Sequence, residues 1–227
     1  MELVLVRHGQ PAWTRDRSAQ VDPELTEIGH RQAVLTADRL AAMRFDRLLV
    51  STARRAQQTS APIRARLEGV ATEDREWLHE IRSPGAWQGT PVEEIGRVLR
   101  DARDRPRSHW WDGLPGGESF RDFHARVTSG LVAELATLGV EHDPSSGLWR
   151  VPNEDHRRLL LVAHAGTNSV VLGNLLGLEP EPWEWERFAS DHTSLTVLRS
   201  VPIGGGHIFS LQRFSDVGHL PPELVTA

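Results

Sequence analysis

The sequence predicts an α/β protein built as a three-layer α/β/α sandwich, with a mostly parallel central sheet and a cap-like insertion. First, two apolar runs at residues 3–6 and 159–163 are short and uninterrupted, which is typical of strands buried on both faces of a parallel sheet. Second, segments with helical spacing alternate with strand-like segments, as in layered α/β proteins. Third, residues 81–118 interrupt this alternation, and we expect them to form a cap over the sheet edge.

The first strand, at residues 3–6, leads directly into Arg7, His8 and Gly9. Parallel strands deliver their last residues to the carboxyl edge of the sheet, where α/β proteins bind ligands. The guanidinium of Arg7 can bind two phosphate oxygens, and a neutral His8 can act as a nucleophile or a base near pH 7. Gly9 permits close approach of the backbone.

Residues 10–24 are polar and contain two prolines, so they are expected to form a loop that leaves the strand tip. Trp13 in this loop is equally consistent with a pocket wall and with a packing side chain. Thr26 is a good N-cap for the helix that follows. The apolar spacing of that helix continues to about Met43.

The second strand, at residues 45–50, runs into a turn that opens another helix. We expect Ser51 or Thr52 to cap this helix. Arg54 and Arg55 fall in its first turn, where the helix dipole disfavours cations. Their placement makes sense if an anion binds at this N-terminus, and Arg55 is the better candidate to bind it.

The middle of the chain is expected to alternate between regular and irregular segments. The expected segments are an edge strand at residues 70–77, a loop at 83–91, helices at 92–103 and 119–138, and an irregular stretch at 104–117. Trp110 and Trp111 lie in the irregular stretch. They are equally consistent with lining a pocket and with packing the cap onto the core.

The apolar run at residues 159–163 ends in His164, which is followed closely by Gly166. Two buried strands that both end in histidine rarely arise by chance, so we expect His8 and His164 to share one site. The neighbouring segments are expected to be a surface loop at 139–157 with one short strand at 148–151, a helix at 167–178, and a hairpin of strands at 194–201 and 207–214.

Composition limits the class of protein. The 227 residues are 39% hydrophobic and 25% charged, which fits one globular domain over residues 1–227. A net charge of −5 argues against a nucleic-acid or anionic-membrane partner. Cysteine is absent, which excludes disulfides and Cys-ligated metal sites. No apolar run approaches the ~20 residues of a membrane span, and the first residues lack the basic start of a signal peptide. We therefore expect a cytoplasmic protein.

Several motifs, spread in order over nearly the whole chain, resemble the signatures of the histidine phosphatase superfamily, also called the phosphoglycerate-mutase-like family. These motifs are RHG at residues 7–9, LTEIGHRQA at 25–33, STARRAQQT at 51–59, LHE at 78–80, GAWQG at 85–89, GGES at 116–119, HAG at 164–166 and SDVGHL at 215–220. A lone Arg-His-Gly is weak evidence, whereas this ordered set is specific.

The resemblance implies a mechanism. His8 would attack phosphorus and form a phosphohistidine, while Arg7, Arg55 and His164 would hold the phosphoryl oxygens and neutralise the developing charge. Glu80 would give its proton to the leaving alkoxide and later take one from water. Neither a metal nor another cofactor is needed for this chemistry. The residues expected to bind the rest of the substrate are Gln10, Trp13, Trp110, Trp111 and Ala165.

Departures from the family pattern narrow the activity. Gln10 and Pro11 follow the first motif, where many members carry Glu and a hydroxyl residue, and the chain contains no tyrosine. These departures favour hydrolysis of a small phosphomonoester over mutation of phosphoglycerate. Two alternatives stay open: a phosphoglycerate mutase, and a non-catalytic phospho-ligand-binding protein on the same fold. A homodimer also stays open.

Overall fold

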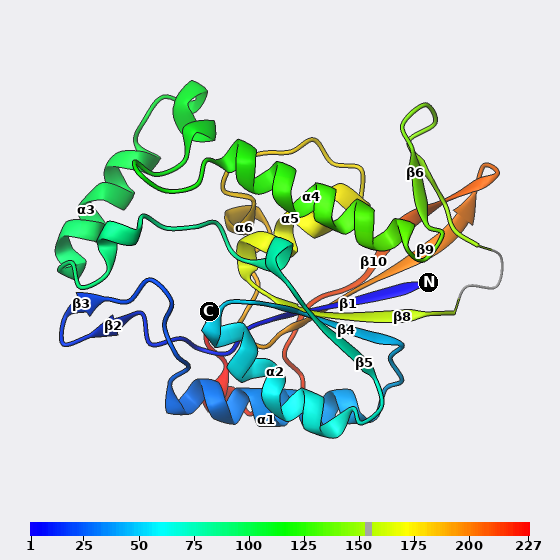
Figure 1. Cartoon of the computed structure of the whole chain (residues 1–227), viewed down its shortest axis with the longest axis horizontal. Helices are drawn as coiled ribbons and strands as arrows, with labels where there is room; N and C mark the ends of the chain where they lie inside the picture. Colours follow the sequence, from blue (N-terminus) through cyan, green and yellow to red (C-terminus); the bar gives the residue numbers. More distant parts are fainter. Residues whose placement is uncertain (153–155) are drawn as a thin grey trace.

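The fold is centred on one large sheet, seen in the computed structural model, which describes residues 1–152 and 156–227. Eight strands form this sheet in the order β5-β4-β8-β1-β9-β10-β7-β6 (Figure 1). Their bounds are β1 (Glu2–Arg7), β4 (Arg47–Ser51), β5 (Ala71–Arg75), β6 (Glu141–Asp143), β7 (Leu148–Arg150), β8 (Arg158–Ala163), β9 (Leu195–Ile203) and β10 (Gly206–Asp216). A separate small hairpin contains β2 (Thr14–Arg15) and β3 (Ser18–Ala19).

The four strands β5, β4, β8 and β1 are parallel, and the strands beyond β1 pair antiparallel. In the parallel part Arg7 pairs with Ala163, and Val50 pairs with Val162. The tips of β1, β4 and β8 therefore lie level with one another. Because all three strands run the same way, the residues that follow them meet at one edge of the sheet.

Helices cover both faces of the sheet (Figure 1). On one face lie α1 (Glu27–Ala41) and α2 (Arg54–Arg66); on the other lie α4 (Phe120–Ala136), α5 (Ala165–Leu175) and the short α6 (Glu184–Arg187). Side chains of β1 alternate between the two layers, because successive strand residues point to opposite faces. Leu3 and Leu5 pack in the cluster that contains Phe123 of α4, whereas Val4 and Val6 pack with Leu40 of α1. The predicted three-layer α/β/α architecture is thus confirmed.

Several predicted elements are observed at or near their expected bounds. Thr26 caps α1, since its hydroxyl accepts a hydrogen bond from the N–H of Gly29. The helix expected at 92–103 is α3 (Val92–Arg103), and β5 is an edge strand. The helix expected at 119–138 is α4, which Ser119 caps through the N–H of Asp122. The hairpin expected near the C-terminus is formed by β9 and β10.

Other boundaries were predicted incorrectly. The N-cap of α2 is Ala53, without a side-chain cap. Neither Ser51 nor Thr52 takes that place; the hydroxyl of Ser51 lies 2.8 Å from Nε2 of His164 instead. The helix after His164 begins at Ala165 and ends at Leu175, two to three residues before the expected limits at each end.

Short elements were missed. The loop at 10–24 contains the β2–β3 hairpin, and the stretch at 104–117 contains the 3₁₀ helix η3 (Arg107–Asp112). The segment at 139–157 contains two strands, β6 and β7, where one was expected, and its residues 153–155 lie outside the described part of the chain. The four-residue helix α6 was not expected at all.

Residues 81–118, the expected cap, contain the 3₁₀ helix η2 (Gly85–Trp87), α3 and η3. They lie beyond one end of the sheet, next to the β2–β3 hairpin (Figure 1). Backbone hydrogen bonds join the two segments: Ala19 N–H to Thr90 O at 2.9 Å, and Val92 N–H to Arg17 O at 3.1 Å. Within the described residues, none of the helices is both long and apolar enough to cross a membrane.

Candidate active site

The two histidine-ended strands bring their imidazoles together. His8 follows β1 and His164 follows β8, and their ring centroids are 5.1 Å apart. Both are buried, at 3% and 0% exposed. The shared parallel register explains this proximity, because the β1 and β8 tips are hydrogen-bonded neighbours and His8 N–H donates to Ala163 O at 2.9 Å.

His8 has a defined tautomer. Its Nδ1 lies 2.8 Å from the carbonyl oxygen of Gly9, and since a carbonyl only accepts, Nδ1 carries the proton. Nε2 therefore holds a lone pair, which accepts a hydrogen bond from Nε of Arg55 at 3.2 Å. Burial lowers the pKa of His8 well below its ordinary value, and the charges of Arg55 and Arg7 lower that pKa further. His8 is thus a neutral imidazole with an available nucleophilic nitrogen.

Two guanidinium groups lie beside this imidazole, one half-buried (Arg7) and one buried (Arg55). Arg7 donates to the carbonyl of Ser190 and to Nε2 of His192, and Arg55 is 3% exposed. Nε of Arg7 and Nη1 of Arg55 are buried with no hydrogen-bond partner among residues 1–152 and 156–227. Buried donors without partners are costly, so these N–H groups are suited to bind the oxygens of an anion.

Arg55 lies at the N-terminus of α2, where the sequence predicted an anion. The carboxylate of Asp22 is present there: it accepts from the N–H of Arg54 at 3.0 Å and lies 3.5 Å from Nη1 of Arg55. Trp13 flanks the same guanidinium, whose Cζ is 4.9 Å from the ring centroid. The pKa of Arg55 is lowered by burial, which the charges of Glu80 and Asp22 oppose.

His164 is held by the tip of β4. Its Nε2 lies 2.8 Å from Oγ of Ser51, and its Nδ1 is buried without a partner in the described residues. Burial lowers the pKa of His164 well below its ordinary value, and the charge of Arg55 adds to this effect. An anion bound beside His8 would favour the protonated form of His164. His164 could then donate to an oxygen of that anion.

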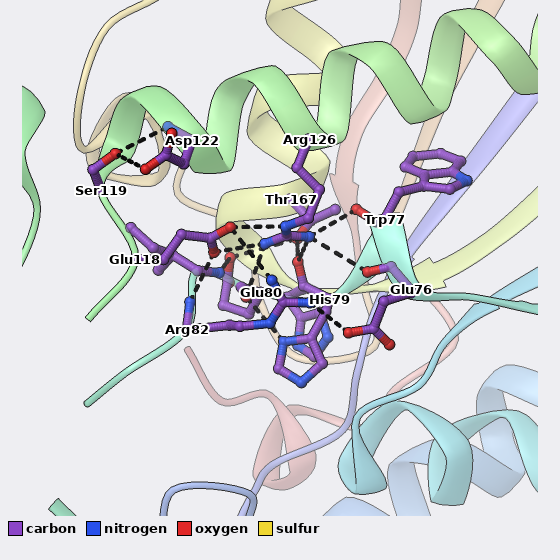
Figure 2. A network of polar contacts seen from close by, with 12 residues as sticks. Glu76, Trp77, His79, Glu80, Arg82, Glu118, Ser119, Asp122, Arg126 and Thr167 are labelled. Carbon is purple, nitrogen blue, oxygen red and sulfur yellow. Dashed lines mark hydrogen bonds and ion pairs between the residues drawn. The ribbon is translucent and has the colours of Figure 1, made fainter. Parts of the chain in front are cut away.

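Glu80 reaches the site from the segment after β5 and the 3₁₀ helix η1 (Glu76–Leu78). Its carboxylate accepts from Gly166 N–H at 2.9 Å and from Ile81 N–H at 3.1 Å. Oγ1 of Thr167 lies 3.5 Å from Oε1 of Glu80 (Figure 2). A side chain at position 166 would displace the Glu80 carboxylate or the Trp185 ring, because an added Cβ would lie 2.5 Å from Oε1 of Glu80 and 2.8 Å from the nearest ring carbon of Trp185. Burial lowers the pKa of Arg7, and the charge of Glu80 opposes this effect only in part.

The residues expected to bind the rest of the substrate are dispersed. Ala165 directly follows His164 at the start of α5. Gln10 bonds through its side chain to the Thr26 hydroxyl at 2.8 Å. Trp13 is 47% exposed beside Arg55, which leaves part of its ring available to a ligand.

Trp110 and Trp111 are placed differently. Nε1 of Trp110 donates to the carbonyl of Arg105 at 3.0 Å. The ring of Trp111 packs edge-on against that of His124, with 5.5 Å between the two ring centroids. Both rings pack against the main core cluster. These contacts favour the packing alternative for the two rings.

His192 was missed by the sequence analysis. It is 3% exposed, and its ring centroid lies 5.7 Å from that of His8. Its Nε2 is 3.1 Å from Arg7 and its Nδ1 is 2.9 Å from Oγ1 of Thr226. Because a guanidinium only donates, Nε2 accepts and Nδ1 carries the proton. Burial first, and the charge of Arg7 second, lower the pKa of His192 to about 3.

Residues 1–152 and 156–227 contain no group of three or more His, Asp or Glu side chains arranged to bind a metal ion.

Comparison with known proteins identifies the family. The family model of the histidine phosphatase superfamily (branch 1) matches residues 3–208. The chain belongs to this superfamily. The resemblance that the motifs indicated is therefore confirmed.

Named relatives include a glucosyl-3-phosphoglycerate phosphatase of Mycobacterium tuberculosis, 33% identical over 183 residues that cover 80% of this chain and 78% of the relative. The solved structure of a mycobacterial glucosyl-3-phosphoglycerate phosphatase with inorganic phosphate has a TM-score of 0.70 and 29% identity, covering 97% of this chain and 99% of that one.

A third relative is the mitochondrial serine/threonine-protein phosphatase PGAM5 of Rattus norvegicus, 27% identical over 99% of this chain. The chain spans only 65% of the length of that protein. The family and these names support phosphatase activity of the phosphoglycerate-mutase type on small phosphorylated molecules.

Proposed function

We propose that this protein is a metal-independent phosphomonoesterase that hydrolyses small phosphorylated molecules through a phosphohistidine on His8. The observation that carries the proposal is the state of His8: a neutral ring, with its proton on Nδ1 and its Nε2 lone pair beside Arg55. A protein that only bound phosphate would have no need of an available nucleophile and a carboxylic acid in one site. This argument favours the phosphatase over the non-catalytic alternative.

In the first step, the lone pair of His8 Nε2 attacks phosphorus, and the bond from phosphorus to the ester oxygen breaks. Arg7, Arg55 and His164 hold the phosphoryl oxygens and stabilise the charge that develops on them. The carboxyl group of Glu80 gives a proton to the leaving oxygen as that bond breaks. The products are an alcohol, a phosphorylated His8 and an ionised Glu80.

In the second step, water replaces the alcohol. The carboxylate of Glu80 takes a proton from that water as its oxygen attacks phosphorus. The bond between Nε2 and phosphorus breaks, and its electron pair returns to the ring. Inorganic phosphate leaves, and both His8 and Glu80 regain their starting forms.

Further proposals concern the rest of the chain. We propose one domain over residues 1–227, with residues 81–118 acting as a cap that encloses the leaving group of the substrate. The backbone hydrogen bonds between this segment and the β2–β3 hairpin, which follows Trp13, support a shared wall. The expected cytoplasmic location and a homodimer stay predictions, to be tested by cell fractionation and analytical ultracentrifugation.

The substrate class can be narrowed by a panel. Glucosyl-3-phosphoglycerate belongs on it because mycobacterial relatives carry that substrate in their names, and a phosphoserine peptide belongs on it because of the rat relative. Simple alkyl phosphates, such as glycerol 2-phosphate, and p-nitrophenyl phosphate complete the panel. Conversion of 3-phosphoglycerate to 2-phosphoglycerate would instead favour the mutase alternative.

The test of the proposed mechanism is capture of the intermediate. Phosphorus-labelled substrate should leave an acid-labile, base-stable adduct on the wild-type protein, and His8→Ala should lose both the adduct and turnover while staying folded. Activity should survive EDTA, and orthovanadate should inhibit because it mimics the five-coordinate phosphoryl group. If His8→Ala kept more than a few per cent of the wild-type turnover rate, His8 would not be the nucleophile.

A further inference from the structure

We propose that Arg126 and Glu118 form a clamp that sets the position of Glu80, which makes Arg126 a positioning residue for proton transfer to the leaving group. The inference rests on the proposed function, because it takes Glu80 as the acid. Arg126 lies in α4, and Glu118 lies just before that helix. In Figure 2, the Arg126 side chain extends from α4 across the segment that carries Glu80.

One side of the clamp is a set of backbone contacts. Nη1 of Arg126 donates to the carbonyls of Trp77 at 3.0 Å and His79 at 2.9 Å, with a longer contact of 3.4 Å to that of Glu76. Nη2 lies 3.3 Å from the carbonyl of Glu80 itself. Carbonyls near the end of a helix lack intrahelical donors, and Arg126 donates to that of Trp77 in η1 and to that of His79 just beyond it.

The other side of the clamp is an ion pair. Nε and Nη2 of Arg126 donate to the two carboxylate oxygens of Glu118 at 2.8 and 2.7 Å. The side chains are only 16% and 9% exposed, and bidentate, charge-assisted hydrogen bonds in such surroundings are strong and directional.

Glu118 also holds the chain beyond Glu80. Its Oε2 accepts from the N–H of Arg82 at 3.0 Å, and its own N–H donates to the carbonyl of Arg82 at 2.9 Å. Residues on both sides of Glu80 are thus joined to the start of α4 (Figure 2). The backbone of Glu80 has little freedom to move toward or away from His8.

The geometry separates two tasks. Hydrogen bonds from Gly166 and Ile81 orient the carboxylate of Glu80, whereas the clamp fixes the backbone from which that carboxylate extends. The hydrogen bonds of Arg126 go to main-chain carbonyls and to Glu118. Arg126 therefore acts on the reaction through Glu80. Displacing a reacting group by about 1 Å can cost ~10²-fold in rate, so loss of the clamp should impair proton transfer selectively.

The experiment compares Arg126→Gln and Glu118→Gln with wild type on two substrates. One is the best alkyl phosphate of the panel, with glycerol 2-phosphate as the default; the other is p-nitrophenyl phosphate, whose leaving group is stable as an anion. The quantity measured is kcat/KM, because it reports the first chemical step. General acid catalysis contributes ~10²–10⁴-fold, so kcat/KM should fall by about tenfold or more for the alkyl phosphate and by less than about threefold for p-nitrophenyl phosphate. Glu118→Gln keeps the side-chain shape, and it carries the test if Arg126→Gln does not fold.

Arg75→Gln is the matched control. Arg75 also joins an edge of the sheet to α4, through Glu134 at 2.7 Å, and also pairs with Glu73 at 2.6 Å. Arg75 precedes η1 in the chain, but the described contacts of its side chain go to Glu134, Glu73 and the carbonyl of Asp74 and not to residues 76–80. Its loss should lower Tm while leaving the ratio of the two kcat/KM values unchanged.

The same two kcat/KM values, measured for Glu80→Gln, distinguish failure of the proposed role of Glu80 from failure of the clamp proposal. If Glu80→Gln slows both substrates equally, the proposed role of Glu80 as the leaving-group acid is wrong. If Glu80→Gln affects the alkyl phosphate selectively but Arg126→Gln and Glu118→Gln do not, the clamp is purely structural and the inference is overturned.

Discussion

At the scale of residues, the site combines two cations with three imidazoles that burial keeps neutral. Arg7 and Arg55 carry the positive charge, while His8, His164 and His192 all have lowered pKa values. Each imidazole has its own hydrogen-bond partner: Gly9, Ser51 and Thr226. The neutral state leaves His8 with its lone pair, and it lets His192 accept from Arg7.

His192→Phe is predicted to lower kcat/KM by the same factor for all phosphate esters, whatever their leaving group. An aromatic ring is kept, but Arg7 loses the acceptor that lies 3.1 Å from its guanidinium. Hydrogen bonds to charged groups contribute ~1.5–3 kcal/mol, so kcat/KM should fall by roughly tenfold or more for alkyl and aryl phosphates alike. Binding of orthovanadate should weaken in parallel. His192→Asn, which keeps an acceptor, should retain more activity; selective loss on alkyl phosphates would contradict this role.

Sequence reasoning named Arg7, His8, Arg55, Glu80 and His164 because each lies in a short, contiguous motif. His192 had no such signal. Its role depends on contacts with residues 185 positions before it and 34 positions after it in the chain. Such long-range contacts leave no local pattern from which a single sequence can be interpreted.

At the scale of elements, the long periodic segments were predicted well and the short ones were not. The β2–β3 hairpin turns through Asp16 and Arg17, both with positive φ, where Gly or Asn would have indicated a turn. The helix α6 spans four residues, and its N-cap residue, Trp183, is also in the left-handed region. These segments are held by neighbours such as the cap rather than by their own propensity.

Trp111→Ala is predicted to lower Tm, whereas Trp13→Ala is predicted to lower kcat/KM. Trp111 packs against the core and His124, so its removal should cost about 2 kcal/mol, below the ~3–5 kcal/mol of a fully buried Trp. That loss corresponds to a fall in Tm of about 4–8 °C, with unchanged kcat/KM. Trp13 is exposed beside Arg55, so its loss should lower kcat/KM with little change in Tm. Thermal melts and substrate-panel kinetics check both; a selective kinetic defect in Trp111→Ala would contradict the packing assignment.

At the scale of the whole molecule, an acidic chain encloses a site with positive groups. The net charge is −5, and the composition is that of an ordinary globular protein. Composition could not indicate which ionisable groups are buried in their neutral form. Besides the site histidines, Glu184 is buried at 5% exposed, and burial raises its pKa to about 7.

These buried groups predict how the free energy of unfolding depends on pH. His192 has a folded pKa of about 3, against an ordinary value of 6.5, and His8 and His164 are lowered in the same direction. Between these values the unfolded chain binds protons that the folded chain does not, so stability rises with pH. The stabilising contribution is present above about pH 6.5 and is lost as the pH falls below it, by up to ~1.4 kcal/mol per pH unit for each histidine.

Glu184 acts in the opposite sense. Its folded pKa of about 7 lies above the ordinary 4.5, so in that window the folded chain holds a proton that the unfolded chain has lost, and stability rises as the pH falls. We therefore expect urea unfolding to show a net loss of stability from pH 7 to pH 5. The loss should be steeper in Glu184→Gln, which removes the opposing group, and shallower in His192→Phe, which removes one histidine. Equal slopes in wild type and both variants would show that these groups do not remain buried with their shifted pKa values in solution.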